Sequence, residues 1–235
     1  MTRIAVISDV HGDVHALQDA LAHIAKLGCE KIVCAGDLVD FGRFPEKTVA
    51  LLRQRKIPCV QGNHDRWAIG NGSAAFPDPI EDASGWDASG WSLSSSTMTF
   101  LEALPATIRV TIGGVRILLC HARPGSDMEG IYEDAPSSTV IEGWFESCNV
   151  DVILVGHTHA PLVRRIKGGR LVANPGMLMR EPRNAIDPAM LFDKASGKFV
   201  RLEPILGTFG VFDTEKREFV VRRIGSDEIM DVQAR

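Results

Sequence analysis

Two histidines follow a short apolar run in the second half of the chain. The stretch "DVILVGHTHAPL" (151–162) holds five residues typical of a buried strand, then Gly156, then His157 and His159. In an extended backbone, side chains two residues apart point to the same side, so we expect both imidazoles to aim at one point. Such a pair is typical of metal ligands. On this stretch alone, a polar turn that contains histidine is the alternative.

Other expected strands also end in residues that can bind metal. Open α/β sheets bind ligands at the carboxyl ends of their strands, so residues far apart in the sequence can converge there. Five of the seven histidines stand at such ends, whereas His15 and His23 lie inside an expected helix and are interpreted as ordinary helix residues. Glycines precede several of these positions and allow the chain to turn sharply. The strand-end residues are Asp9, His11, Asp37, Asn63, His64, Asp65, His121, His157 and His159.

Seven of these residues form a plausible ligand set of oxygen and nitrogen atoms without thiolate. The set is Asp9, His11, Asp37, Asn63, His121, His157 and His159. One ion rarely uses so many groups, whereas two ions that share a carboxylate would. Mixed histidine and carboxylate ligands suit Mn, Fe, Zn or Ni. Paired ions about 3.5–4 Å apart are the known arrangement for in-line displacement at phosphorus, so the predicted chemistry is phosphoester hydrolysis.

The elements that would position these residues alternate between strand and helix. "RIAVIS" (3–8) is an expected strand, and residues 13–28 carry Leu17, Leu21 and Ile24 at helical spacing, with Asp13 as N-cap. "KIVCAG", "PEKTVALLRQR" and "IPCVQG" continue the pattern as strand, helix and strand. This alternation favours βαβ units and a sheet covered by helices.

The rest of the chain indicates hairpins and further helices. "ATIRVTIGGVRILLCHA", "PLVRRIKGGRLVANPG" and "GTFGVFDTEKREFVVRRI" are expected hairpins, and helices are expected near 93–104 and over 137–147. We expect one domain over residues 1–235, with surface excursions near 69–104 and 184–206.

Composition restricts the function classes. The net charge is −4 and the hydrophobic fraction 45%, which is ordinary for a globular protein and gives no basic track for nucleic acid. No segment approaches the length of a membrane span, and the N-terminus does not resemble a signal peptide. Five cysteines without a C-x-x-C pair are interpreted as reduced. We therefore expect a cytoplasmic protein that binds a small phosphorylated substrate rather than membrane or nucleic acid.

Taken together, the motifs resemble those of the calcineurin-like metallophosphoesterases. "SDVHG" (8–12), "GDLVD" (36–40), "GNHD" (62–65), His121 after a strand and "GHTH" (156–159) follow the order and spacing of that superfamily, and "NPG" (174–176) stands where its closing turn is usual. The likeness is closest to its small bacterial and archaeal single-domain branch. It implies a four-layer α/β/β/α sandwich with mixed sheets and a metal site at the C-terminal ends of strands.

The resemblance also implies a role for each residue. Asp9, His11 and His159 would hold one ion, Asn63, His121 and His157 the other, and Asp37 would bridge the two ions, with Mn preferred and Fe, Zn or Ni as alternatives. A bridging water or hydroxide would be the nucleophile. His64 would lie beside the leaving group, with Asp40 on its other ring nitrogen. Arg123, two residues after His121, is a candidate for binding substrate phosphate.

Several functions fit this set of residues. A dinuclear phosphohydrolase, acting on phosphomonoesters, phosphodiesters or nucleotides, is favoured because the ligand set and His64 are both complete. A binding module that keeps the fold without chemistry is the alternative. A nuclease is disfavoured by the missing basic track, and a protein phosphatase is neither supported nor opposed by these residues.

Overall fold

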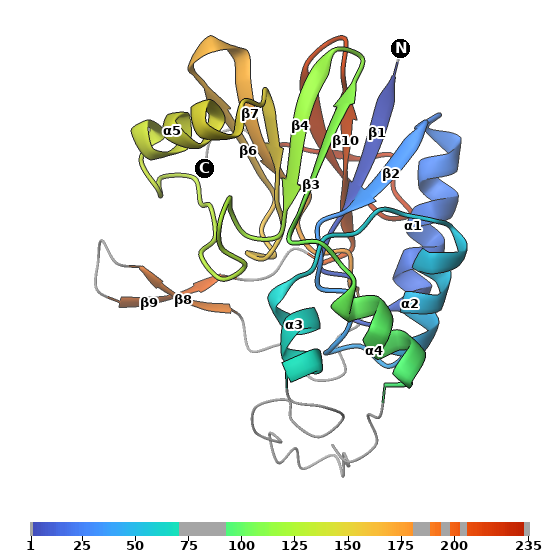
Figure 1. Ribbon diagram of the computed structural model, residues 1–235. Helices are drawn as coiled ribbons and strands as arrows, with labels where there is room; N and C mark the ends of the chain where they lie inside the picture. The colour runs from blue at the N-terminus through green and yellow to red at the C-terminus, as the bar shows by residue number, and fades with distance from the viewer. Residues whose placement is uncertain (1, 71–92, 181–188, 194–197, 203–205, 233–235) are drawn as a thin grey trace.

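The fold is built from two mixed sheets packed face to face, with helices on their outer faces. The computed structural model describes residues 2–70, 93–180, 189–193, 198–202 and 206–232. Within these residues each of the two sheets has five strands. Figure 1 shows α1 and α2 beside one sheet and α5 beside the other. The expected four-layer α/β/β/α sandwich is therefore confirmed.

The two sheets differ in how their strands are connected. In the first sheet the order is β12-β11-β10-β1-β2, and only β1 and β2 are parallel. Its strands are β1 (Arg3–Ile7), β2 (Lys31–Cys34), β10 (Thr208–Asp213), β11 (Glu218–Arg223) and β12 (Ile229–Met230). In the second sheet the order is β3-β4-β5-β7-β6, and β5 runs parallel to both β4 and β7. Its strands are β3 (Thr107–Ile112), β4 (Val115–Cys120), β5 (Val152–Leu154), β6 (Leu162–Ile166) and β7 (Arg170–Asn174).

The helices begin where the sequence supplies capping groups. Helix α1 (Val14–Lys26) follows Asp13, whose side chain accepts a hydrogen bond from the Ala16 N–H, as expected. Helix α2 (Pro45–Gln54) starts with proline, whose missing N–H is not needed at that position. The others are α3 (Asn63–Gly70), α4 (Ser95–Glu102) and α5 (Ser138–Cys148), with a short 3₁₀ turn at Lys167–Gly169.

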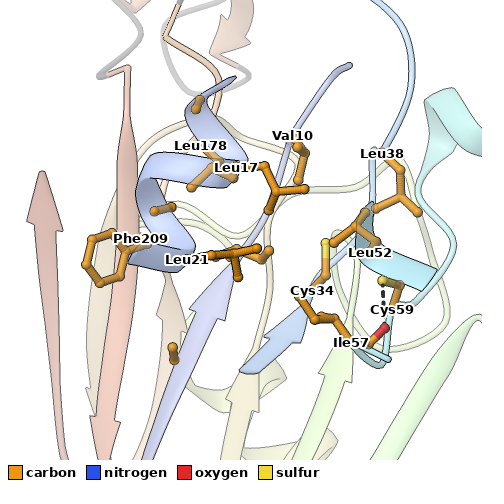
Figure 2. Packing of buried hydrophobic residues seen from close by; sticks show 14 of the residues in the cluster. Val10, Leu17, Leu21, Cys34, Leu38, Leu52, Ile57, Cys59, Leu178 and Phe209 are labelled. Carbon is orange, nitrogen blue, oxygen red and sulfur yellow. Dashed lines mark hydrogen bonds between the residues drawn. The ribbon is translucent and has the colours of Figure 1, made fainter. Parts of the chain in front are cut away.

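Alternation along the strands supplies three hydrophobic clusters. On β1, Ile4 and Val6 face the second sheet, while Ala5 and Ile7 face the helices. Leu118 and Ile153 of the second sheet pack instead toward α5. Figure 2 shows the cluster beneath α1 and α2, where the following residues meet: Val10, Leu17, Leu21, Cys34, Leu38, Leu52, Ile57, Cys59, Leu178 and Phe209.

Most expected elements are present, with two corrections. All three hairpins form as β3–β4, β6–β7 and β10–β11, and the helix expected near 93–104 is α4, which buries Leu101 in the core. The strand expected in "IPCVQG" is wrong: only an isolated bridge joins Cys59 to Cys34. Helix α3 was not expected at all.

The two expected excursions fall partly outside the described residues. Residues 71–92 of the first, and 181–188, 194–197 and 203–205 around the second, are not described. In the described part of the second, β8 (Ala189–Asp193) and β9 (Lys198–Leu202) form an antiparallel pair. All five cysteines are free, and none of the described helices has the length and apolar composition needed to cross a bilayer.

Candidate metal centre

The carboxyl ends of β1, β2 and β5 bring four side chains to one place. Asp9, His11, Asp37 and His159 each offer a ligand atom, and these atoms all lie within 4.8 Å of one another. His11 Nε2 is 3.2 Å from His159 Nε2, and His159 Nε2 is 3.4 Å from Asp9 Oδ1. Two imidazole nitrogens and two carboxylates at this spacing form a suitable set of ligands for a divalent metal.

A second set of atoms that could donate an electron pair to a metal, here called a donor set like the first, lies on the other side of Asp37. The side-chain oxygen of Asn63 is 2.9 Å from His121 Nε2 and 3.0 Å from His157 Nδ1. Asp37 Oδ2 is 3.2 Å from His121 Nε2 and 3.9 Å from His11 Nε2, so it lies between the two sets. This oxygen is buried and accepts no hydrogen bond. Burying a carboxylate oxygen without a hydrogen-bond donor costs free energy, and a bound cation would compensate for that cost.

Backbone carbonyls fix the orientation of three of the histidines. Because a carbonyl oxygen can only accept, the ring nitrogen beside it carries a hydrogen, and the other nitrogen is the one that can bind a metal once it is unprotonated. This arrangement is typical of metal-binding histidines, whose second nitrogen is held by an outer partner. The contacts are His11 Nδ1 with Val39 O at 3.1 Å, His121 Nδ1 with Ala35 O at 2.7 Å and His157 Nε2 with Met128 O at 2.9 Å.

Burial and the two aspartates set the charge states of the metal-free site. Burial alone would lower the pKa of His121, but Asp37 and Asp9 outweigh it and raise this pKa to about 10. Burial dominates at His11 and lowers its pKa to about 4. Burial opposes ionisation of Asp37, yet the neighbouring histidines hold its pKa well below the ordinary value. The metal-free site therefore combines ionised carboxylates with a protonated His121.

His64 is placed beside the two sets without joining them. It lies in the first turn of α3, and its backbone N–H donates to Asp37 Oδ1 at 2.9 Å. Its Nδ1 is 2.5 Å from Asp40 Oδ2, the pairing that the family resemblance implied. Burial lowers the pKa of His64, but Asp37 and Asp40 together raise it.

Unusual backbone conformations concentrate at this site. Of the ten described non-glycine residues with positive φ, seven belong to the site or adjoin it, and they include Asp37 (φ 55°) and Asp40 (φ 78°). His157 and His159 have φ values of 69° and 57°. The extended conformation expected for these two residues is therefore wrong, and they serve different donor sets. Left-handed conformations cost on the order of 1–3 kcal/mol each and persist where surrounding contacts enforce them.

Two glycines allow the ligand loops to approach closely. A Cβ at Gly62 would meet the Asp37 carboxylate, and one at Gly156 would meet the side chains of Ser8 and Asp9. Any larger residue at either position would displace a ligand. These contacts give a physical reason for the glycines that precede the ligands.

Two buried residues outside the ligand set hold the ligand loops in place. The Asp65 carboxylate accepts hydrogen bonds from four backbone N–H groups, those of Gly62, Asp37, Leu38 and Val39, at 2.9, 3.0, 2.8 and 3.3 Å. The Asn174 amide donates to the Gly156 carbonyl at 2.7 Å and to the Thr158 hydroxyl at 3.1 Å. We had assigned no role to either residue, although each belongs to a motif that the sequence displays, "GNHD" and "NPG".

Arg123 lies on the loop after β4 and is engaged by protein groups. Its guanidinium is 2.7 Å from the Glu129 carboxylate, donates to the Pro124 carbonyl at 2.9 Å and lies 5.6 Å from the Trp144 ring centre. Its side chain is 23% exposed. Contact between Arg123 and a substrate phosphate would require the exposed Glu129 side chain to move away. Phosphate binding by Arg123 stays a prediction.

The fold and the donor sets together define a metal-dependent phosphoesterase scaffold. The family model of the calcineurin-like phosphoesterase superfamily domain matches residues 2–197, so the chain belongs to that superfamily.

Individual proteins are also similar to this chain in sequence or in structure. An uncharacterized protein of Methanocaldococcus jannaschii is 31% identical over 221 residues, which cover 85% of this chain and 87% of that protein. A metallophosphoesterase from Sphaerobacter thermophilus has a similar structure, with a TM-score of 0.64 and 24% identity over 97% of this chain and 89% of the other. A hypothetical protein from Pyrococcus horikoshii gives a TM-score of 0.72 at 17% identity, covering 97% and 90%. The two structures support the fold alone.

Proposed function

We propose that this protein is a phosphohydrolase that uses two divalent ions. Its substrates would be phosphomonoesters or phosphodiesters of small molecules, or nucleotides. One observation carries the proposal: Asp37 lies between two donor sets, and its buried Oδ2 has no hydrogen-bond donor. Such an oxygen suits a carboxylate shared by two cations.

The chain offers each ion its own set of ligands besides Asp37. Asp9, His11 and His159 would hold the first ion, and Asn63, His121 and His157 the second. Mn is the preferred metal, with Fe, Zn or Ni as alternatives, because the donors are oxygen and imidazole nitrogen. When bound, the ions would supply Lewis acidity and lower the pKa of a water shared between them.

His64 would supply a proton to the leaving group. Hydrolysis breaks the bond between phosphorus and the leaving oxygen, and that oxygen must gain a proton. Asp40 occupies Nδ1 of His64, which leaves Nε2 as the nitrogen available to the substrate. The raised pKa of His64 favours the imidazolium form that an acid requires.

Residues near the metal centre could also contact the substrate. Arg123 is a candidate phosphate contact, with the adjustment of Glu129 described above. The net charge of −4 fits a small phosphorylated substrate better than nucleic acid. A cytoplasmic location is part of the proposal, in line with five free cysteines.

The test is hydrolysis by the purified protein of a panel of phosphomonoesters, phosphodiesters, nucleotides and dinucleoside polyphosphates, with and without Mn. We expect Mn-dependent turnover of at least one class. His64→Ala should keep two ions per chain by metal analysis while turnover falls roughly 10²–10⁴-fold, most on esters with poor alkoxide leaving groups. Two bound ions without turnover in the unmodified protein would favour the binding module instead. Metal loss in proportion to activity in His64→Ala would make His64 a ligand.

A further inference from the structure

Two aromatic side chains contact the ring of His64. The Phe41 ring centre lies 4.9 Å from that of His64 and 4.7 Å from that of His11. The Trp67 ring centre lies 4.7 Å from that of His64. Both Phe41 and Trp67 are half-buried, so each ring keeps part of its surface accessible. The proposed acid, His64, is therefore bordered by aromatic surface.

The backbone that presents Phe41 is unusual. Asp40 and Phe41 are consecutive residues in the left-handed region, with φ values of 78° and 54°. This backbone conformation is rare for a residue with a bulky side chain, because glycine or asparagine adopts it at a lower energetic cost. The turn is held by hydrogen bonds from Phe41 N–H to Asp40 Oδ1 at 2.7 Å and from Gly42 N–H to the Asp40 carbonyl at 2.6 Å. A strained turn that places a phenylalanine against two site histidines indicates a role for the ring.

The positively charged side chain next to Trp67 in the sequence contacts a carboxylate and not His64. Arg66, one residue before Trp67, makes a two-pronged contact with Asp127 at 2.6 and 3.2 Å. Its guanidinium is thus committed to another carboxylate. Next to His64, the rings of Phe41 and Trp67 are better suited to a planar, uncharged group than to a further phosphate.

We propose that Phe41 and Trp67 form a subsite for an aromatic leaving group, such as a benzyl-type alcohol or a nucleoside. This inference rests on the proposed function, because it places the leaving group beside His64. A planar ring bonded close to the scissile oxygen would stack on Phe41 or Trp67, whereas a saturated ring of similar size would gain only apolar contact. The two side chains would therefore determine specificity without touching the metals.

Matched esters isolate the aromatic contribution. Benzyl and cyclohexylmethyl phosphates share a primary alkoxide leaving group, and so do AMP and ribose 5-phosphate. Each would be tested on the Mn-loaded protein as the monoester or the methyl diester, whichever is turned over. We expect kcat/KM to favour the aromatic member of at least one pair roughly 3- to 10-fold, the effect of one stacking contact. Preference in the first pair alone would indicate a simple aryl alcohol, and preference in the second a nucleoside. Equal rates in both pairs would overturn the proposal.

Variants assign the preference to these rings. Phe41→Leu and Trp67→Leu should each bring the ratio within the preferred pair toward one. Phe44→Leu is the matched control: Phe44 is half-buried on the same segment but contacts His15 and Lys47, and its variant should keep the ratio. If Phe41→Leu and Trp67→Leu slowed both members of a pair equally, the rings would only support His64 and the proposal would be wrong.

A binding measurement separates this inference from the proposed function. Benzylphosphonate and cyclohexylmethylphosphonate cannot be hydrolysed at the carbon–phosphorus bond, so calorimetry reports their binding to the Mn-loaded protein without turnover. Tighter binding of benzylphosphonate that is lost in Trp67→Leu would support the subsite even if no ester were hydrolysed. Equal binding of the two phosphonates in a protein that does hydrolyse esters at equal rates would overturn the subsite and leave the phosphohydrolase intact.

Discussion

Asp37 links the two halves of the site at the scale of single residues. Its Oδ2 lies 3.9 Å from His11 Nε2 and 3.2 Å from His121 Nε2, one histidine from each donor set. Two dications at close range repel one another, and an anion between them offsets that repulsion. Asp37→Asn should therefore weaken both ions together, as measured by metal analysis after dialysis. Two ions still tightly bound in the variant would show that Asp37 does not bridge.

Asp40 would affect the proposed reaction through His64, whose Nδ1 lies 2.5 Å from the Asp40 carboxylate. Burial lowers the pKa of His64, whereas Asp37 and Asp40 raise it. Removing the Asp40 charge should lower this pKa, so His64 would lose its proton at a lower pH. For Asp40→Asn we expect the alkaline limb of the kcat/KM profile to move to lower pH, with the metal content unchanged. Asp127→Asn, which alters a half-buried carboxylate paired with Arg66, should leave the limb in place. An unmoved limb in Asp40→Asn would exclude His64 as the acid that this limb reports.

At the scale of elements, one carboxylate joins the loop after β2 to the start of α3. Asp65 accepts four backbone N–H groups from these two segments, which carry Asp37 and Asn63. In Asp65→Asn the amide NH₂ would face N–H groups, and leaving buried donors unsatisfied costs about 1–3 kcal/mol. We expect the melting temperature to fall by several degrees and the metal affinity to fall with it.

Asp213 offers a control for this prediction. It is also buried, and its Oδ1 accepts the N–H groups of Glu215 and Lys216 at 3.1 Å each, at the end of β10. Asp213→Asn should lower the melting temperature without changing metal affinity. If Asp65→Asn behaved in the same way, Asp65 would support the fold without positioning the ligands.

Elements with a repeating hydrophobic pattern were predictable, and α3 was not. Leu17, Leu21 and Ile24 are spaced to face one side of α1, and all three are buried against the first sheet. In α3 the first turn is polar, and no apolar residue repeats at helical spacing before Trp67. Its first turn is fixed by contacts to Asp37, a residue distant in sequence. Tertiary contacts also enforce the left-handed conformations of the ligands, which no local pattern indicates.

At the scale of the whole molecule, the site joins the two sheets. Asp9 and Asp37 follow strands of the first sheet, whereas His121 and His157 follow strands of the second. The residue types could be identified from the sequence, and the family resemblance implied that Asn63 belongs with His121 and His157. Residue spacing alone does not indicate this grouping, because it depends on how the two sheets pack.

Bound ions should therefore stabilise the sandwich. An ion that binds only the folded state at about 100 times its Kd contributes about 2.7 kcal/mol, which is roughly 5–10 °C for a chain of this size. Adding Mn to the chelator-treated protein should raise the melting temperature by such an amount, and Asp37→Asn should reduce the rise. A melting temperature that responds to neither Mn nor chelator would contradict metal binding at this site.

Metal binding should also release protons, because His121 carries an extra proton before a metal binds. The pKa of His121, about 10, means that this ring is protonated at pH values of about 7 to 9, while the pKa of His11, about 4, leaves that ring neutral. A metal ligand must be the neutral imidazole, so the His121 proton has to leave and the apparent metal affinity should rise with pH up to about 10.

Calorimetry of Mn binding in buffers of different ionisation enthalpy measures the protons released. A water shared by the ions can also lose a proton, so the comparison needs His121→Asn, which keeps a ligand oxygen but cannot be protonated. We expect this variant to release about one proton fewer than the unmodified protein. Equal release from the two proteins would show that His121 is already neutral before the metal binds.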